Sequence, residues 1–405
     1  MLQNGTIQSG EPRGAKRYLV LAASVVMLLF LGTGQAWSVF IAPLKAAFGY
    51  SDSQMQLVFT TSSFTFCFLI ILGGRLYDRL GPRPLAVISA LMMAAGWFIA
   101  SHSGSHWFLL WLGAGLLGGG GSAMGYVCPV ATAIAWFPRQ AGLIAGLAAA
   151  GFGLGPILLS NTAECLLSRQ WPVLSVFGFM ASAWPPVVLV TGLLLTLPAS
   201  HPARTAAAGF PCRSLASDRR FWTLFTGMFF GTLPYLVVMG AVKPLGASFG
   251  IGPAAAAMAI STVALGNTFG RIAWGHAVDR LGPRKAMLAS QALMLTGLLA
   301  LILAGRLNAG LFLGSVGVIG FCYGSNFAIY PSTVSRLYGV GVFGSIYPFV
   351  MAAQGVSSLA PTFNGLLHDA TGSYIPGLMM AAALGVAGLF VSAGLTRILK
   401  INGAT

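Results

Sequence analysis

Charged residues, and acidic ones above all, are scarce in this sequence. Only 7% of its 405 residues are charged, and Asp and Glu together number 7 against 22 Lys and Arg. A soluble domain normally carries about 25% charged residues, so the composition excludes a soluble globular protein. Hydrophobic residues make up 56% of the chain, in runs of about twenty that show no strand-like alternation. This pattern predicts an all-α polytopic membrane protein.

The sequence also lacks the motifs of enzymes and metal sites. It contains no glycine-rich phosphate loop, and no serine or cysteine has a plausible general base in reach. Its five cysteines are scattered, without the spacing of a metal site or a disulfide framework. We therefore expect a protein that is not an enzyme and that uses neither a cofactor nor a metal. The first apolar run is too long for a cleaved signal peptide and is expected to stay as a span.

The basic residues are distributed unevenly between the loops. With the apolar runs taken as spans, seventeen of the 22 Lys and Arg fall on one side, and Arg271 lies within a run. The excess marks the cytoplasmic side of the cell (inner) membrane and places both termini there. The charge therefore sets topology and does not indicate a nucleic-acid surface. Four basic residues fall on the opposite side: Lys45, Arg169, Lys243 and Arg306.

Apolar runs predict twelve transmembrane helices. Most connecting segments are short, and several runs contain proline or glycine, as expected where helices bend around a cavity. The expected spans are 18–42, 53–73, 85–103, 107–132, 141–164, 172–197, 221–247, 253–275, 286–304, 308–334, 342–367 and 375–398.

One hexapeptide occurs twice. The segment from Asp78 to Arg83 is repeated from Asp279 to Arg284, 201 residues later, which is about half the chain length. A repeat at this spacing indicates two similar halves. The proline- and arginine-containing segment 198–220 is the expected cytoplasmic linker between an N-terminal six-helix bundle, 1–197, and a C-terminal one, 221–405.

The repeated loop resembles a motif of the major facilitator superfamily. It reads G-x-x-x-D-R-x-G-P-R from Gly74 and again from Gly275. The resemblance implies two pseudo-symmetric bundles, alternating access and a monomer embedded in the lipid bilayer. We expect the loops to gate the conformational change, with acidic groups near helix N-termini and arginines bridging the bundles in one state; a purely topological role is the alternative. The gating residues would be Asp78, Arg79, Arg83, Asp279, Arg280 and Arg284.

Arg271 lies inside an apolar run, where a permanent charge is costly. It could snorkel to water, since the loop begins four residues later at Gly275. However, Asn267, Arg271 and Gly275 share one helix face, and a polar Asn267 favours a face turned to the bundle interior. A guanidinium matches a carboxylate with two parallel hydrogen bonds. The pattern thus indicates a site for a small carboxylate anion.

A narrower resemblance supports this interpretation. The segment from Gly34 to Leu44 is similar to the oxalate:formate antiporter and monocarboxylate porter branch, in which an arginine at the position of Arg271 pairs with the substrate carboxylate. Animal monocarboxylate transporters carry an aspartate four residues earlier. This chain has Asn267 there, which sets it apart from their proton-coupling scheme.

Further candidates lie on other spans. Tyr323 and Phe327 share a face of the tenth span, and Asn326 and Tyr330 are each offset from them by three residues. For these aromatic residues, simple packing is the alternative to a role in the site. Tyr126 precedes Cys128-Pro129 on the fourth span, and Tyr347 shares a face of the eleventh with Gln354. The residues near the outer ends of spans are interpreted either as proton carriers or as solvated side chains: Glu164, His368 and Asp369.

These observations predict a secondary transporter of monocarboxylates such as lactate, pyruvate, formate or acetate, coupled to protons by symport. The alternatives are an oxalate/formate-type anion exchanger and a drug or cation efflux carrier, although every acidic residue lies at or near a loop. In the oxalate transporters of the resembled branch, a lysine on helix eleven accompanies the helix-eight arginine. The eleventh span here has Gln354 and no cation, so we expect poor recognition of dianions.

Overall fold

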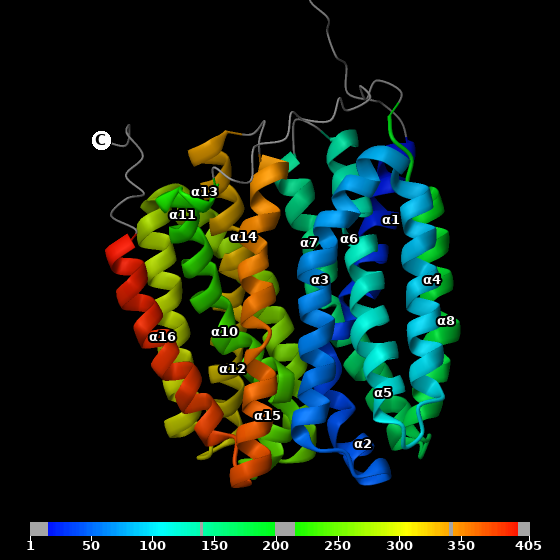
Figure 1. The fold of residues 1–405 in the computed structure, drawn as a ribbon, viewed down its shortest axis with the longest axis vertical. Helices are drawn as coiled ribbons and strands as arrows, with labels where there is room; N and C mark the ends of the chain where they lie inside the picture. The colour runs from blue at the N-terminus through cyan, green and yellow to red at the C-terminus, as the bar shows by residue number, and fades with distance from the viewer. Residues whose placement is uncertain (1–14, 138–140, 199–214, 340–342, 396–405) are drawn as a thin grey trace, which may run out of the picture.

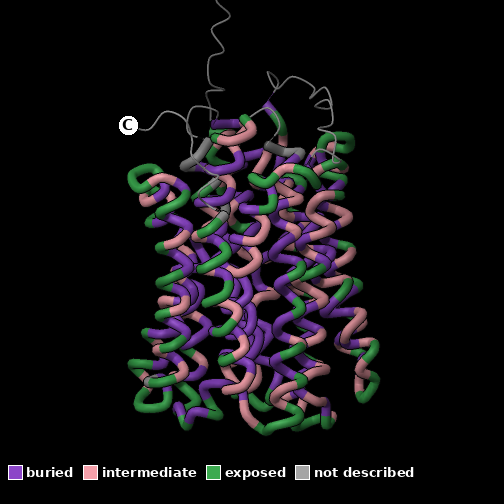
Figure 2. The backbone as a smooth tube through the Cα atoms, turned by 60° about the vertical axis from the view of Figure 1, so that its left-hand side comes forward, coloured by how far each residue is buried: buried purple, intermediate pink, exposed green. Residues whose placement is uncertain are grey.

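The computed structural model describes residues 15–137, 141–198, 215–339 and 343–395, and within these ranges all regular structure is helical. The helices run side by side in two groups, one from each half of the chain (Figure 1). Buried residues lie along the middle of the bundle and exposed residues at its periphery and ends (Figure 2). The first group comprises α1 (Ala15–Leu31), η1 (Gly32–Val39), α2 (Ile41–Phe48), α3 (Asp52–Leu80), α4 (Pro82–Ser101), α5 (Trp107–Leu110), η2 (Trp111–Leu117), α6 (Gly118–Trp136), α7 (Ala141–Ser168) and α8 (Val173–Leu194).

The second group follows the expected linker, of which residues 199–214 lie outside the described part of the chain. The twelve-helix fold is confirmed. Nine of the described helices are individually long and apolar enough to cross a membrane, and α11 is long enough for two spans. The elements are α10 (Arg219–Ser248), α11 (Pro253–Ala304), α12 (Ala309–Gly324), η4 (Ser325–Phe327), α13 (Ile329–Tyr338), α14 (Phe343–Ser357), α15 (Ala360–Thr371) and α16 (Ile375–Leu395).

The repeated loop has the same backbone in both halves. Gly81 and Gly282 have φ of 78° in each case, a left-handed value that glycine adopts without the penalty of a Cβ. A proline follows each glycine and occupies the first position of the next helix. The sequence predicted open loops here, at 74–84 and 276–285. Instead, the helices continue up to the glycine and resume directly after it, because one glycine and one proline suffice for the turn.

Several spans are interrupted near their middle. The first changes from α1 to the 3₁₀ segment η1, the tenth is broken at η4, and the eleventh is broken between α14 and α15. In a membrane, broken backbone is tolerated where it is buried in protein or lines a cavity. The breaks therefore indicate where the two halves enclose a site.

The halves touch along a few helix pairs. The structure packs α14 and α15 against α3, α11 against α7, and α10 against η1. We call the end of the bundle that carries Gly81 and Gly282 the basic end. The end that carries α2, the start of α3 and the end of α15 is the far end, at the bottom of Figure 1.

Candidate functional site

Arg271 lies on α11 and turns into the bundle. The residue is only 7% exposed. Its Nε donates a hydrogen bond to Asn267 Oδ1 at 3.3 Å. The guanidinium carbon lies 4.2 Å from the centre of the Phe327 ring, a cation–π contact. The i, i+4 face predicted from the sequence is thus present, and the snorkelling alternative is not what the structure shows.

The tenth span approaches Arg271 closely because of Gly324. A Cβ on this glycine would lie 2.5 Å from the carbonyl oxygen of Asn267 and 2.8 Å from the amide nitrogen of Arg271. Any larger residue would push the two helices apart. The glycine therefore sets the distance at which Phe327, one turn further on, meets the guanidinium.

Tyr126 reaches the same place from the first half of the chain. Its hydroxyl lies within hydrogen-bonding reach of the Arg271 guanidinium. Its ring packs edge-on against Phe152, at 5.1 Å between centroids, and against Phe66 at 5.5 Å. The predicted site residues Asn267, Arg271, Phe327 and Tyr126 are thus brought together from both halves.

Tyr323 is fully buried and belongs to an aromatic stack. Its ring lies parallel to that of Tyr235, with centroids 3.5 Å apart, and edge-on to Phe327 at 5.4 Å. The hydroxyl of Tyr235 donates to Gln35 Oε1 at 3.0 Å, joining α10 to η1. This stack therefore crosses the boundary between the halves.

Tyr235 and Gln35 were not predicted as site residues. Tyr235 follows Pro234 on its span, as Tyr126 comes shortly before Pro129, and an aromatic residue with a polar tip beside a helix-bending proline was the available signal. Gln35 is a polar residue in an otherwise apolar run. Their pairing, 200 residues apart in sequence, carried no local signal at all.

The other polar residues of the tenth span face elsewhere. Asn326 donates to Thr232 Oγ1 at 2.8 Å, and Tyr330 is buried in a cluster with Met287 and Met228, against which Phe327 also packs. These contacts lie within the second half. The contacts of Asn326 and Tyr330 agree with the packing alternative, and Tyr323 and Phe327 stay candidates for the site.

A small cavity lies between the halves beside this cluster. The space open to the centres of water molecules is about 40 Å³. Tyr323 and Gln354 line it, whereas Arg271, Tyr126 and Phe327 are not among its lining residues. Tyr126 packs against the lining residues Phe66 and Phe152, and Phe327 packs against Tyr323. Tyr347 lies two helical turns before Gln354 on α14. The lining residues are Leu31, Gly32, Gly34, Gln35, Phe59, Ser62, Ser63, Phe66, Gly119, Ser122, Phe152, Leu236, Tyr323 and Gln354.

The gating residues expected from the repeated loops lie at the basic end, and all six are exposed. Asp279 forms an ion pair with Arg336, a residue of α13 in the same half. The structure thus places the loops as predicted at corresponding positions of the two halves. The bridging of the halves by their arginines stays a prediction for another state.

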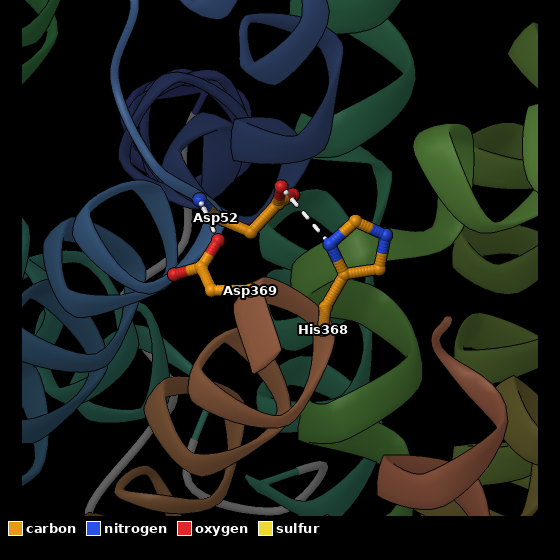
Figure 3. Close-up of side chains that lie close together, drawn as sticks. All are labelled: Asp52, His368 and Asp369. Atoms are coloured by element: carbon orange, nitrogen blue, oxygen red, sulfur yellow. Dashed lines mark hydrogen bonds and ion pairs between the residues drawn. The ribbon is translucent and has the colours of Figure 1, made fainter. Parts of the chain in front are cut away.

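The far end is where ionisable groups join the halves. Asp52, whose side chain is 2% exposed, lies 3.1 Å from His368 Nδ1 (Figure 3). It accepts a hydrogen bond from Tyr374 Oη at 2.6 Å. It also pairs with Lys45 of its own half. The two carboxylate oxygens of Asp369 accept from the backbone amides of Asp52 and Ser53, both at 2.8 Å. Glu164 pairs with Lys243 between α7 and α10.

These contacts revise one interpretation of the sequence. Glu164, His368 and Asp369 were weighed as proton carriers or as solvated residues at span ends. In the structure each of them bonds to the other half. The pKa of Asp369 is lowered, because the hydrogen bonds from Ser53 and the Asp52 amide outweigh the opposing effect of partial burial. This carboxylate is therefore ionised and holds the N-terminus of α3.

Comparisons with known proteins agree with this architecture. A family model described as Major Facilitator Superfamily matches residues 22–361 and 224–402. The oxalate:formate antiporter of Oxalobacter formigenes is 26% identical over 84% of this chain and 82% of its own. Human monocarboxylate transporter 11 is 26% identical over 82% of this chain and 72% of its own. In the crystal structure of a bacterial homologue of the human lysosomal transporter Spinster, 97% of the chain superposes on 96% of this one with a TM-score of 0.72 at 15% identity.

Proposed function

Because the chain belongs to the major facilitator superfamily, we propose that it is a secondary transporter that moves small monocarboxylate anions by alternating access. One observation carries the proposal: a buried arginine lies where the two halves meet, with Tyr126 from one half and Asn267 and Phe327 from the other. A carboxylate bound by the guanidinium would form a neutral complex. Both halves would contribute to its binding, as alternating access requires.

We further propose proton-coupled symport by a monomer in the inner membrane, with both termini cytoplasmic. Asn267 cannot titrate, so the proton would not be carried at this position of α11. A proton could instead join the anion itself or nearby water. Coupling of this kind predicts uptake that rises as the external pH falls.

The test is uptake of labelled lactate into proteoliposomes, with and without an inward proton gradient. Arg271→Gln should weaken carboxylate binding by about 2–5 kcal/mol, the cost typical of removing one partner of a buried charge pair. The matched control is Arg306→Gln, since Arg306 also lies over an aromatic ring, at 5.0 Å from that of Phe249, but outside the site. Near-normal uptake by Arg271→Gln at normal membrane levels would refute the proposal.

Anion exchange is the second candidate, favoured by the similarity to an oxalate:formate antiporter. Exchange of monoanions such as formate fits the same site, and counterflow without a proton gradient would reveal it. Oxalate fits less well, because Gln354 brings no second cation to the cavity and an unpaired buried carboxylate costs several kcal/mol. We expect Gln354→Lys to shift preference toward oxalate. Oxalate that displaces lactate equally well from the unmodified protein would contradict the single-cation argument.

A further inference from the structure

One face of α3 carries polar residues that bond to the other half of the chain near the far end. Asp52, Gln56 and Thr60 are spaced four residues apart and share this face, and they are only 1%, 0% and 2% exposed. Gln56 Nε2 donates to the backbone carbonyl of Gly240 at 3.0 Å, and Thr60 accepts from Thr362 at 2.8 Å. Amides and aliphatic hydroxyls do not change charge near neutral pH. Any response of this closure to pH must therefore come from the contacts of Asp52.

His368 of α15 faces Asp52 across the boundary between the halves. Its ring stacks on Tyr374, with centroids 4.0 Å apart, and its Nδ1 lies 3.1 Å from Asp52 Oδ2 (Figure 3). Within the described residues, no group is aligned for a hydrogen bond with this nitrogen, so the contact is electrostatic. A neutral imidazole gains little from it, whereas an imidazolium is attracted to the carboxylate. The side chain is 19% exposed, so protons from solution can reach it.

The charges around His368 favour a second cation. Asp52 and Asp369 bring two negative charges to this cluster, and their carboxylates lie close to the imidazole. Lys45 of α2 pairs with Asp52 and brings one positive charge. Histidine is the side chain that ordinarily changes charge between pH 5 and 8. A proton on His368 would therefore balance the charge of the cluster.

The other helices packed against α15 bring no further unpaired charge to this cluster among the described residues. The helix α16 has no ionisable residue within Ile375–Leu395. On α10, Lys243 is paired with Glu164. The phenol of Tyr374 is neutral near pH 7. The charge state of His368 thus decides whether the cluster is balanced.

We propose that His368 is a proton-sensitive latch, whose protonation stabilises the state closed at the far end. The inference rests on the alternating access of the proposed function. When the halves separate, His368 leaves with the second half, while Asp52 stays with Lys45 in the first. The imidazolium then loses its carboxylate partner, so the closed state binds the proton more tightly than the open state. By linkage, a falling pH shifts the balance toward closure, with or without a bound substrate.

The test measures the distance across the far end without substrate. Spin labels are attached at Ser105→Cys, between α4 and α5, and at Leu307→Cys, between α11 and α12, which are exposed positions in the two halves. Serine replaces the exposed Cys165, and also Cys212 of the linker. Double electron–electron resonance on the full-length protein in lipid nanodiscs then gives the ratio of closed to open molecules at about pH 5.5 and about pH 8, on either side of the usual range of histidine.

We expect this ratio to be about three- to tenfold higher at the lower pH, as for one largely buried charge pair beside solvent. The same measurement in a Thr60→Ala background, which lacks one bond of the closure, brings the open state into range if the parent is closed at both pH values. His368→Gln should abolish the pH dependence, and His368→Arg, whose charge is permanent, should keep the ratio high throughout. His106→Gln is the matched control, because His106 is an exposed histidine within the first half at the same end, and it should leave the pH dependence unchanged.

The outcomes separate the latch from the proposed function. A ratio that ignores pH in both backgrounds, or a pH dependence that survives in His368→Gln, refutes the latch. A pH dependence that disappears on addition of EDTA also refutes it, because a metal ion held by Asp52, His368 and Asp369 would then be responsible. If lactate shifts the distance but pH does not, alternating access stands and the latch alone is wrong. A distance that is the same under every condition overturns both.

Discussion

The two ends of the boundary between the halves are built differently. At the far end Asp52, Asp369 and Glu164 each bond to the opposite half, and Thr362 donates to Thr60 at 2.8 Å a little deeper. At the basic end the arginines of both repeated loops are exposed, and Asp279 pairs within its own half. The same chain thus uses charge to join its halves at one end and to face solvent at the other.

A difference of this kind between the two ends is expected in any one conformational state of a transporter that works by alternating access. A transporter that rocks its halves about a central site is held together at one end at a time. We interpret the structure as the state closed at the far end. On the proposed topology the cavity would then exchange with the cytoplasm, and the repeated loops would come together when the far end opens.

Locking the far end should have the largest effect. In the double variant Thr60→Cys, Thr362→Cys the two thiols replace hydroxyl groups already in contact, so oxidation should form a disulfide and fix this state. We expect uptake to fall to background on oxidation and to return on reduction. Each single variant serves as the control under the same oxidant. Transport that continues through the oxidised double variant would mean that this end does not open.

Weakening the far end should have an intermediate effect. Asp52 is buried and contacts Lys45, His368 and Tyr374. Because the Lys45 side chain is about one-third exposed, water can replace part of the interaction that Lys45 loses when the Asp52 charge is removed. We expect Asp52→Asn to shift the balance away from the closed state by roughly 1–2 kcal/mol, or about tenfold. The readout is a slower rate of disulfide formation between Cys substituted at Thr60 and Thr362.

Asp279→Asn is the matched control for that experiment. It removes one carboxylate of an exposed ion pair at the basic end, and exposed pairs contribute little. The cross-linking rate should therefore stay within about twofold of the parent. Equal effects of the two substitutions would abolish the distinction between the two ends.

Much of this architecture could be predicted from the sequence, because membrane spans and repeats are local signals. Apolar runs gave the helices, and the duplicated hexapeptide gave the two halves. The contact between Asn267 and Arg271 followed from their spacing on one helix face. In each case the signal lies within one helix or one repeat.

The contacts between helices that are far apart in the sequence could not be predicted. Asp52 and Asp369 are 317 residues apart, and Tyr235 and Gln35 are 200 apart. No pattern within either helix indicates such a pairing. The sequence predicted that helices would bend, but it did not predict the positions of the breaks at η1 and η4. Proline and glycine mark where a helix can bend, but they do not indicate which side chains then face the cavity.

Among the far-end substitutions, the smallest expected effect is that of Asp369→Asn. The carboxylate accepts two amide hydrogen bonds at the start of α3, and an asparagine can keep one of them. Loss of the charge beside a helix N-terminus should change the cross-linking rate by about two- to fivefold. Because the pKa of Asp369 is lowered, its contribution is present at neutral pH and is lost only as the pH falls below the usual range of a carboxyl group. Asp369 therefore does not titrate between pH 5 and 8, and pH-driven lactate uptake should persist in the variant. If Asp369→Asn abolishes pH-driven uptake but leaves exchange intact, this carboxylate carries the proton, and the far end is the coupling site as well as a closure.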